Sequence, residues 1–176
     1  DGKIWVTGDH DSYALPGSSA DFTTFTDVSA EFGDHTQTAT SVVYASSAAR
    51  STQVLMENGD VWSFGDDGGS TGGLGQGASP TSDRTPRKLT GISNVTKLSH
   101  DGDMTIALDS SNVVWMWGRN ILGNQTAGWG PYNVPTNIMG TGSANLTSLL
   151  VSGETVTDIE SSWTSIFILT NKGTVY

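Results

Sequence analysis

The chain has 176 residues, of which 35% are hydrophobic and 15% charged, and it contains no cysteine. Eighteen acidic residues outnumber eight basic ones, which gives a formal net charge of −10. This composition is too apolar for a disordered chain, it excludes disulfides and cysteine-based catalytic or zinc sites, and its negative charge disfavours nucleic-acid partners. No apolar run approaches the roughly 18 residues of a membrane-spanning helix, so we expect no membrane insertion.

The first predicted element is a strand with one central tryptophan, Gly2–Gly8. Similar segments follow at Gly59–Gly65 and Val113–Gly118, and Gly173–Tyr176 begins a fourth copy. Neighbouring side chains of a strand point to opposite faces, and in the second and third copies both faces are apolar. We therefore expect these strands in a sheet that is covered on both sides.

An apolar strand and a short polar turn precede each later copy of the tryptophan strand. The apolar pairs are Val54-Leu55, Ala107-Leu108 and Ile168-Leu169. In two of the turns Gly59 and Gly173 supply the positive φ that a tight hairpin requires. A further landmark lies ten residues before each Leu: Val42 with Ala45, Val95 with Leu98, and Val156 with Ile159.

These landmarks keep the same order three times, and they indicate an internal repeat rather than separate domains. The approximate repeats are 2–58, 59–112 and 113–172, with 173–176 starting a further one, in a single repeat region that spans 1–176. We find no amphipathic helix of useful length. The chain opens on Asp1 rather than Met, which indicates a processed chain or a piece of a longer protein.

The repeat resembles that of the RCC1 family (regulator of chromosome condensation), in which a Gly-x-Val-aromatic-x-aromatic-Gly strand leads to a Gly-rich turn, a Pro and two apolar strands. The middle copy fits best, with Gly72–Gly77 as the Gly-rich turn and Pro86 after it. In the first copy Ala14–Gly17 stands at the place of this turn. The third copy has Asn124-Gln125-Thr126 there and a longer insertion, Gly140–Gly153.

This resemblance implies an all-β chain of about three four-stranded antiparallel blades of a β-propeller. Family members usually close a ring of blades, so other blades or other copies of the chain are expected to complete it. Tryptophans 5, 62, 115 and 117 repeat with the blades, and we interpret them as core residues. The His that the family usually places before its Ala-Leu strand is absent, with Ser51, Met104 and Ser165 at those positions.

Two loop aromatics near each other, Trp129 and Tyr132, and a third at Trp163 do not follow the blade pattern. Loop aromatics are favoured anchors for proteins or glycans, although packing over a blade edge is the alternative. Asp101 and Asp103 in an Asp-Gly-Asp turn complete our set of candidate binding residues.

Nothing in the sequence points to an enzyme. The histidines, His10, His35 and His100, accompany no nucleophile elbow, phosphate loop or metal-binding spacing, and we interpret them as polar loop residues. Asp-rich turns such as Asp66-Asp67-Gly68 lack the spacing of a calcium loop, so we expect Asx-type turns, no metal and no cofactor. The basic stretch from Arg84 to Lys97 is either an anion-binding patch or a solvated strand face.

The sequence thus favours a non-enzymatic binding or structural module that presents loops on a rigid propeller to a protein or glycan. The acidic, cysteine-free, Ser/Thr-rich composition suits an extracellular, cell-surface or virion setting, such as an adhesin, a secreted binder or a fibre or decoration component. The resemblance leaves two alternatives: a guanine-nucleotide-exchange regulator of a small GTPase, or a propeller-type inhibitor of a secreted enzyme.

Overall fold

The structure is a computed structural model. It describes residues 2–9, 15–33, 38–44, 51–67, 72–77, 82–101, 104–119, 132–140, 145–162 and 165–176. Nearly all regular elements in these ranges are strands, and the two helices, η2 (Ser29–Phe32) and α1 (Leu146–Leu149), have four residues each. No helix in the described ranges has the length and apolarity that crossing a membrane requires.

The strands form four antiparallel sheets in chain order. The first contains β1 (Trp5–Gly8) and β2 (Phe22–Asp27). The second has the order β3-β4-β5-β6, with bounds Ala39–Tyr44, Ser51–Met56, Val61–Asp66 and Ser82–Lys88. The third has the order β7-β8-β9-β10, with bounds Val95–Asp101, Met104–Asp109, Val114–Gly118 and Tyr132–Asn137. The fourth contains β11 (Val156–Ser162) and β12 (Ser165–Thr170), to which Val175 adds a single bridge at Leu169.

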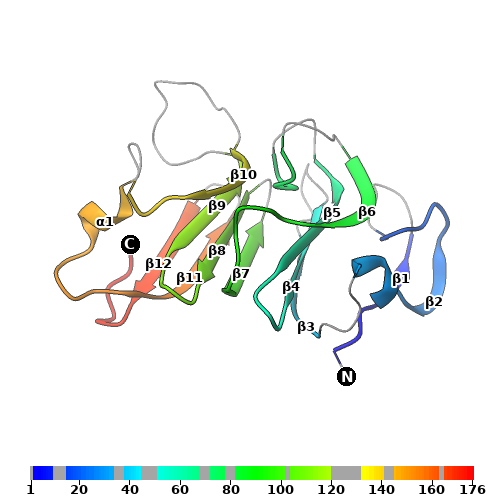
Figure 1. Ribbon diagram of the computed structural model, residues 1–176, viewed down its shortest axis with the longest axis horizontal. Helices are drawn as coiled ribbons and strands as arrows, with labels where there is room; N and C mark the ends of the chain where they lie inside the picture. Colours follow the sequence, from blue (N-terminus) through cyan, green and yellow to red (C-terminus); the bar gives the residue numbers. More distant parts are fainter. Residues whose placement is uncertain are drawn as a thin grey trace.

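The sheets stand side by side along the molecule, and β1–β2 and β11–β12 lie at its two ends (Figure 1). The inner strands β3, β7 and β11 bring successive sheets into contact. This is the predicted arrangement of antiparallel four-stranded blades, with two complete sheets and a two-stranded sheet at each end in the described residues. The sequence repeats are offset from the sheets by two strands, because each repeat starts in the third strand of one sheet.

Hairpin geometry follows the predicted turns. Gly59 and Gly173 have φ values of 81° and 78°, and Asn112 takes the same left-handed region, with φ 63°, in the hairpin between β8 and β9. Asn tolerates this conformation better than other non-glycine residues because its short side chain can hydrogen-bond locally.

One landmark is misplaced in the first copy. Leu98 pairs with Ala107, nine residues later in the chain, but the equivalent pair in the second sheet is Val42 with Val54, twelve residues apart. Val42 therefore corresponds to Leu98, and the prediction that Ala45 does so is wrong. Between equivalent paired residues the chain is three residues longer in the second sheet than in the third, so counting ten residues back from Leu55 passes the last residue of β3.

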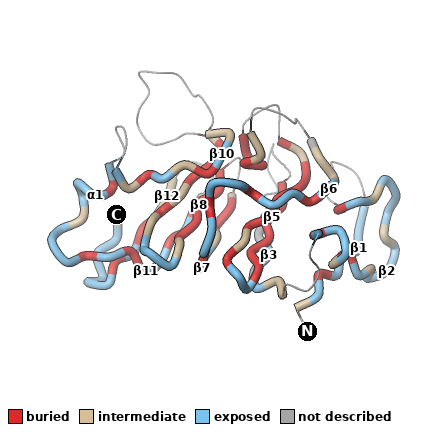
Figure 2. The backbone as a smooth tube through the Cα atoms, in the orientation of Figure 1, coloured by how far each residue is buried: buried red, intermediate tan, exposed pale blue. Residues whose placement is uncertain are grey.

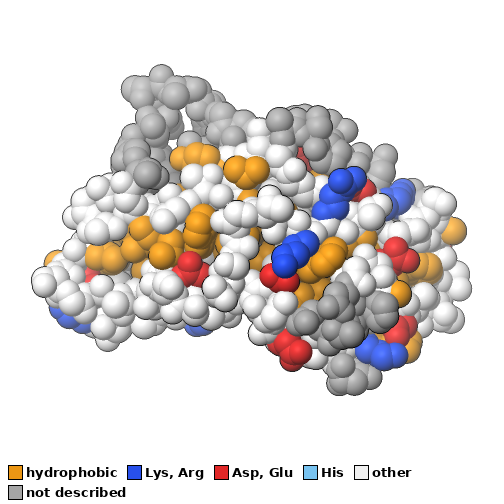
Figure 3. Space-filling view, in the orientation of Figure 1, with side chains coloured by type: hydrophobic (Ala, Val, Ile, Leu, Met, Phe, Trp, Pro, Cys, Tyr) orange, Lys and Arg blue, Asp and Glu red, His pale blue; other side chains and the backbone are white. Residues whose placement is uncertain are grey.

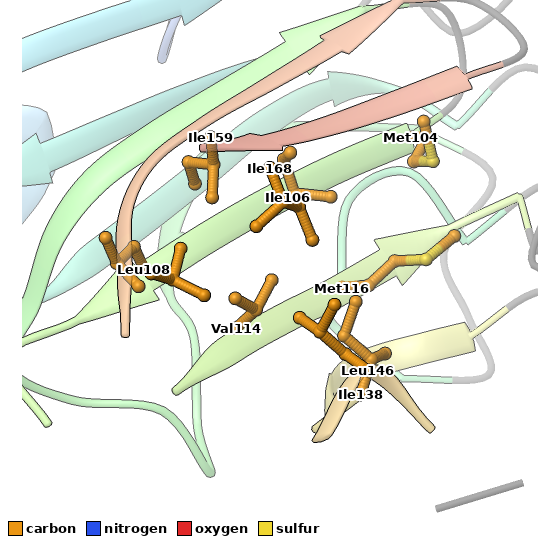
Figure 4. Packing of buried hydrophobic residues seen from close by; sticks show 10 residues of the cluster. Met104, Ile106, Leu108, Val114, Met116, Ile138, Leu146, Ile159 and Ile168 are labelled. Carbon is orange, nitrogen blue, oxygen red and sulfur yellow. The ribbon is translucent and has the colours of Figure 1, made fainter. Parts of the chain in front are cut away.

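The core lies between the sheets rather than within one of them. One cluster joins β8 and β9 to β11 and β12 through Ile106, Leu108, Val114, Ile159 and Ile168, whose side chains converge in Figure 4. Two further clusters join the second sheet to its neighbours on either side. Buried positions accordingly follow the middle strands, and exposed ones gather at the ends (Figure 2).

The tryptophan prediction is confirmed in part. Trp117 is fully buried, and Trp62 and Trp115 are half-buried against the clusters that join successive sheets. The prediction is wrong for Trp5, which is 51% exposed. No sheet in the described residues lies on the outer side of β1–β2, so this indole has no neighbouring face to cover it.

Candidate binding face

The antiparallel strand order brings the candidate residues to one edge of the sheets. In the third sheet Asp101 pairs with Met104, Met104 with Gly118, and Gly118 with Tyr132. These residues form a row across the sheet, and we call the edge on which they and their equivalents lie the loop edge (the upper edge in Figure 1). The hairpins β4–β5 and β8–β9 turn at the opposite edge, which we call the hairpin edge.

Asp101 and Tyr132 therefore share the loop edge but do not touch. Three strand spacings of about 4.8 Å separate them by about 14 Å. Asp101 is half-exposed, and Tyr132 is half-buried because its ring packs against two core clusters. Trp129, Trp163 and Asp103 lie outside the described residues. The described strand ends that flank them belong to the loop edge.

The Gly-rich turn 72–77 is held at the loop edge by a buried carboxylate. Asp67 accepts hydrogen bonds from the backbone N–H groups of Gly72 and Leu74, at 3.1 and 3.2 Å. Burial raises the pKa of Asp67, and these backbone donors oppose that shift by stabilising the charged form. These two donors lie five and seven residues after Asp67, so the contacts anchor the Gly-rich turn and are not those of the predicted Asx-type turn. Gly68 lies outside the described residues.

The same turn connects the second sheet to the third. Gly77 donates its N–H to the carbonyl of Asn133 on β10, at 2.7 Å. Gly17 donates its N–H to the backbone carbonyl of Arg84 on β6, at 2.8 Å. The segment that includes Leu15–Gly17 thus takes the place of the Gly-rich turn between the first two sheets, as its position in the repeat predicts.

His100 is a buried residue at the junction of two sheets. It belongs to β7 and is 7% exposed, so its interpretation as a polar loop residue is wrong. Its Nε2 lies 2.9 Å from the hydroxyl of Ser51 on β4, and its Nδ1 lies 2.9 Å from the Met104 carbonyl. A carbonyl can only accept, which places the ring proton on Nδ1 and makes the Ser51 hydroxyl the donor to Nε2.

Burial lowers the pKa of His100 to about 4, although the nearby carbonyls of Met104 and Ser51 and the charge of Asp101 favour protonation. The ring is neutral at physiological pH. His100 lies two residues after Leu98 on β7, so the two side chains point to the same face of the sheet. This spacing is the sequence signal that could have shown His100 to be an inward-facing residue. His10 and His35 lie outside the described residues.

The basic stretch from Arg84 to Lys97 is not a free anion-binding patch. Arg87, Lys88 and Lys97 form ion pairs with Asp83, Asp60 and Asp158. Arg84 donates to the carbonyl of Ser18, at 2.8 Å. Basic side chains on the right-hand part of the face viewed in Figure 3 accordingly lie beside acidic ones. These cations are engaged within the chain, and the chain as a whole carries a net charge of −10.

Metal binding finds no geometric support in the described ranges. No three His, Asp or Glu side chains gather there as a metal ion would need.

Comparison with known proteins gives a consistent result at the level of fold. No protein-family model and no curated protein sequence matches the chain. Among solved structures, human WBSCR16 matches 99% of the chain with a TM-score of 0.75 and 19% identity. Yeast RCC1 (Prp20) bound to Kap60 matches 98% with a TM-score of 0.68 and 18% identity. A second structure of Prp20p from Saccharomyces cerevisiae, described with its binding to Gsp1p and histones, matches 98% with the same TM-score and 18% identity.

The chain spans about two fifths of each of these structures, between 39% and 42% of their length. The match covers nearly the whole chain, and with it the antiparallel four-stranded sheets that the repeat resemblance predicts. The chain has the RCC1-like β-propeller fold.

Proposed function

We propose that the chain is a non-enzymatic binding module that recognises a protein partner through the loop edge. The observation that carries this proposal is that strand ends of successive sheets, including those that bear Asp101 and Tyr132, lie on a single edge. Loops held by a rigid scaffold are where binding residues concentrate, and aromatic anchors beside polar groups suit protein recognition.

Charge indicates the kind of partner. The cations from Arg84 to Lys97 are paired within the chain, whereas acidic residues are in excess. Complementary potential steers partners together and penalises like charge, so a basic protein surface fits and a nucleic acid does not. Prp20p is described with binding to histones, which are basic proteins, and this supports the same kind of partner here.

Titration of the chain with purified core histones, as a basic protein probe, and with duplex DNA tests this proposal. We expect binding to the basic protein that weakens with salt, and no binding to DNA. Asp101→Asn should weaken binding about fivefold, which corresponds to about 1 kcal/mol for a half-exposed charge.

Glu57→Gln is the matched control for this variant. It also removes one negative charge, but it lies on the exposed hairpin between β4 and β5, at the hairpin edge. Equal effects of the two variants would reduce the interaction to non-specific attraction by net charge, and the loop edge would not be the site. Binding to a glycan panel in place of the basic protein would overturn the choice of partner.

A second candidate function is regulation of a small GTPase by nucleotide exchange, which the likeness to Prp20 favours, since that protein is described with binding to Gsp1p. Accelerated release of a fluorescent guanine nucleotide from a small GTPase would support this function. Inhibition of a secreted enzyme by a propeller face has no observation of its own in favour.

We extend the proposal to an exposed setting, on a cell surface, on a virion or in the extracellular medium, with the ring completed by further sheets. The support for the setting is composition alone: no cysteine, excess acid and abundant Ser and Thr. Immunodetection in separated medium, surface, particle and interior fractions would test it, and detection in the interior fraction alone would overturn it.

A further inference from the structure

Two buried polar side chains lie beneath the Gly-rich turn 72–77. Gln53 on β4 and Ser63 on β5 are both 0% exposed. They oppose each other across the two strands, so their side chains share one face of the second sheet. At the same register the third sheet has Ile106 opposite Met116, both fully buried in an apolar cluster. Of these two four-stranded sheets, only the one that carries the Gly-rich turn has the polar pair.

Both side chains bind the backbone of the turn. Gln53 Nε2 donates to the Gly73 carbonyl at 3.0 Å, and the Ser63 hydroxyl donates to the Leu74 carbonyl at 2.6 Å. Gln76 reaches back from the turn, and its Nε2 donates to the Ser63 carbonyl at 2.9 Å. A carbonyl can only accept, so these contacts fix the orientation of both glutamine amides and with it the positions of both Oε1 atoms.

Three buried polar atoms around this turn have no hydrogen-bond partner: Gln53 Oε1, Gln76 Oε1 and Trp117 Nε1. Trp117 belongs to β9 of the third sheet, and its Nε1 would lie 2.8 Å from a Cβ atom placed on Gly75, so this nitrogen lies against the turn. No other buried side-chain nitrogen or oxygen in the described part of the chain lacks a partner. The unsatisfied groups are therefore concentrated at one place in the fold.

Water fits this mixed set of groups. An unsatisfied group costs free energy in the interior, because folding removes its hydrogen bonds to solvent. The indole N–H would repel a cation, and the two amide oxygens would repel an anion. The carboxylate of Asp67, which would attract a cation, already accepts from backbone N–H groups of the turn. Water both donates and accepts, and a buried water usually makes about three hydrogen bonds to groups of this kind.

We propose that the Gly-rich turn encloses bound water, which accepts from Trp117 Nε1 and donates to the Oε1 atoms of Gln53 and Gln76. This water links the second sheet, the turn and the third sheet through groups that have no direct partner. Because the turn lies at the loop edge, the bound water helps to hold that edge in place. The inference does not rest on the binding function proposed above.

Water-selective nuclear Overhauser spectra of isotope-labelled protein test the contact at the indole. Trp117→Phe identifies the Trp117 Nε1–H resonance by its loss. Phe64, buried at the same register of the second sheet, indicates that phenylalanine fits this position. We expect a cross-peak between water and the Trp117 N–H with the sign of a long-lived contact. Trp115 is the matched control, because its indole N–H donates to Asp109 at 2.9 Å and should show no long-lived water.

Oxygen-17 relaxation dispersion of the solvent detects long-lived waters without interference from exchanging hydroxyl protons. Gln53→Met keeps the length of the side chain and removes its amide, so the dispersion amplitude should fall by the equivalent of about one water molecule. Ser161→Ala is the control, because it removes a buried hydroxyl whose partner, Ser99, belongs to the protein. This control should leave the amplitude unchanged. Gln76→Met, at a half-buried position, replaces Gln53→Met if circular dichroism shows that the first variant does not fold.

A cation at the turn would give a different result. Urea unfolding at equal ionic strength in potassium, sodium and choline chloride should give equal stabilities if water occupies the site. Stabilisation by potassium or sodium alone, lost in Gln53→Met, would overturn the assignment to water.

Absence of the cross-peak at Trp117, or a dispersion amplitude that the glutamine variant does not change, would also overturn the proposal. None of these measurements contains a partner protein. A negative result here would therefore leave the binding function untouched, and failure to bind histones would leave this inference untouched.

Discussion

His100 is an ionisable side chain buried between two sheets without an ion pair. Both ring nitrogens face oxygen atoms, Nε2 at Ser51 and Nδ1 at Met104 and Thr105. A neutral imidazole satisfies these contacts, whereas an imidazolium would lose hydration without a counter-charge in the junction. The charge of Asp101 favours protonation, but its effect is the smallest of those that act on the ring.

We therefore predict acid sensitivity at this residue. The pKa of His100 is about 4 in the folded state, against 6.5 in a model peptide. Between these values the unfolded chain binds the proton more readily, so stability is full above pH 6.5 and falls as the pH decreases towards 4. At pH 5 the loss is about 2 kcal/mol.

Urea unfolding of wild type and His100→Gln at pH 7, 6 and 5 measures this loss. The variant should show a flatter dependence on pH across this range, whatever its stability at pH 7. Parallel dependences for the two proteins would show that His100 does not carry the sensitivity.

At the scale of elements, the Gly-rich turn depends on the absence of side chains at a sheet junction. Gly75 has φ +68°, and a Cβ atom placed on it would lie 2.6 Å from Cδ1 of Trp117. Trp117 is fully buried, so its indole cannot move away without disturbing the third sheet. Both backbone conformation and space therefore require glycine.

Gly75→Ala and Gly91→Ala separate these two requirements. Gly91 has φ +80° and no heavy atom within 4 Å of a Cβ position, so its variant should lose only the conformational cost of about 1 kcal/mol. Gly75→Ala should lose a further 1–3 kcal/mol, roughly, from the overpacked contact. Chemical denaturation of both variants checks this, and equal losses would show that the turn adapts to the extra methyl group.

The strands were predictable because their residues recur in order, and hairpin glycines such as Gly59 show where two strands turn. The first copy of the inner strand was placed three residues too late, since loop length between strands is not encoded in the apolar pattern.

A hydrogen bond that recurs in each repeat was not predicted. Thr40, Thr96 and Thr157 each donate from the hydroxyl to the carbonyl of the Leu in the next strand, at 3.1 to 3.2 Å. Threonine is so common in this chain that spacing alone did not distinguish them.

For the whole molecule, the polar contacts described between the third and fourth sheets are of two kinds. Lys97 and Asp158 form an ion pair of 2.7 Å whose side chains are 43% and 54% exposed. Ser99 and Ser161 lie in the buried part of the same junction, where the Ser99 hydroxyl accepts the Ser161 N–H at 2.8 Å and approaches the Ser161 hydroxyl at 3.0 Å.

Their burial predicts different contributions to stability. Ser99→Ala leaves a buried backbone N–H without this acceptor and should cost about 1–3 kcal/mol in the free energy of unfolding. Lys97→Ala removes a solvent-exposed pair and should cost less than about 1 kcal/mol, with a smaller effect at high salt. Urea unfolding at low and high salt distinguishes the two variants, and the reverse ranking would contradict this assignment.

The candidate site was predictable only in outline. Alternating strand directions place Asp101 and Tyr132 on one edge, but their register across β8 and β9 depends on pairing that the sequence does not specify. Tyr132 also packs on two core clusters, which its position in a loop-like Gly-Pro-Tyr segment did not indicate. Trp129, Trp163 and Asp103 stay predictions, because they lie outside the described residues.

The two-strand offset between repeats and sheets has a consequence for how the chain unfolds. A repeat contributes its first two strands to one sheet and its last two to the next, so no repeat can open without disrupting both. Repeat proteins whose units contact only their neighbours can fray one unit at a time. Here the covalent chain ties adjacent sheets together, and we expect amide protons in β4, β5, β8 and β9 to exchange in a single cooperative step.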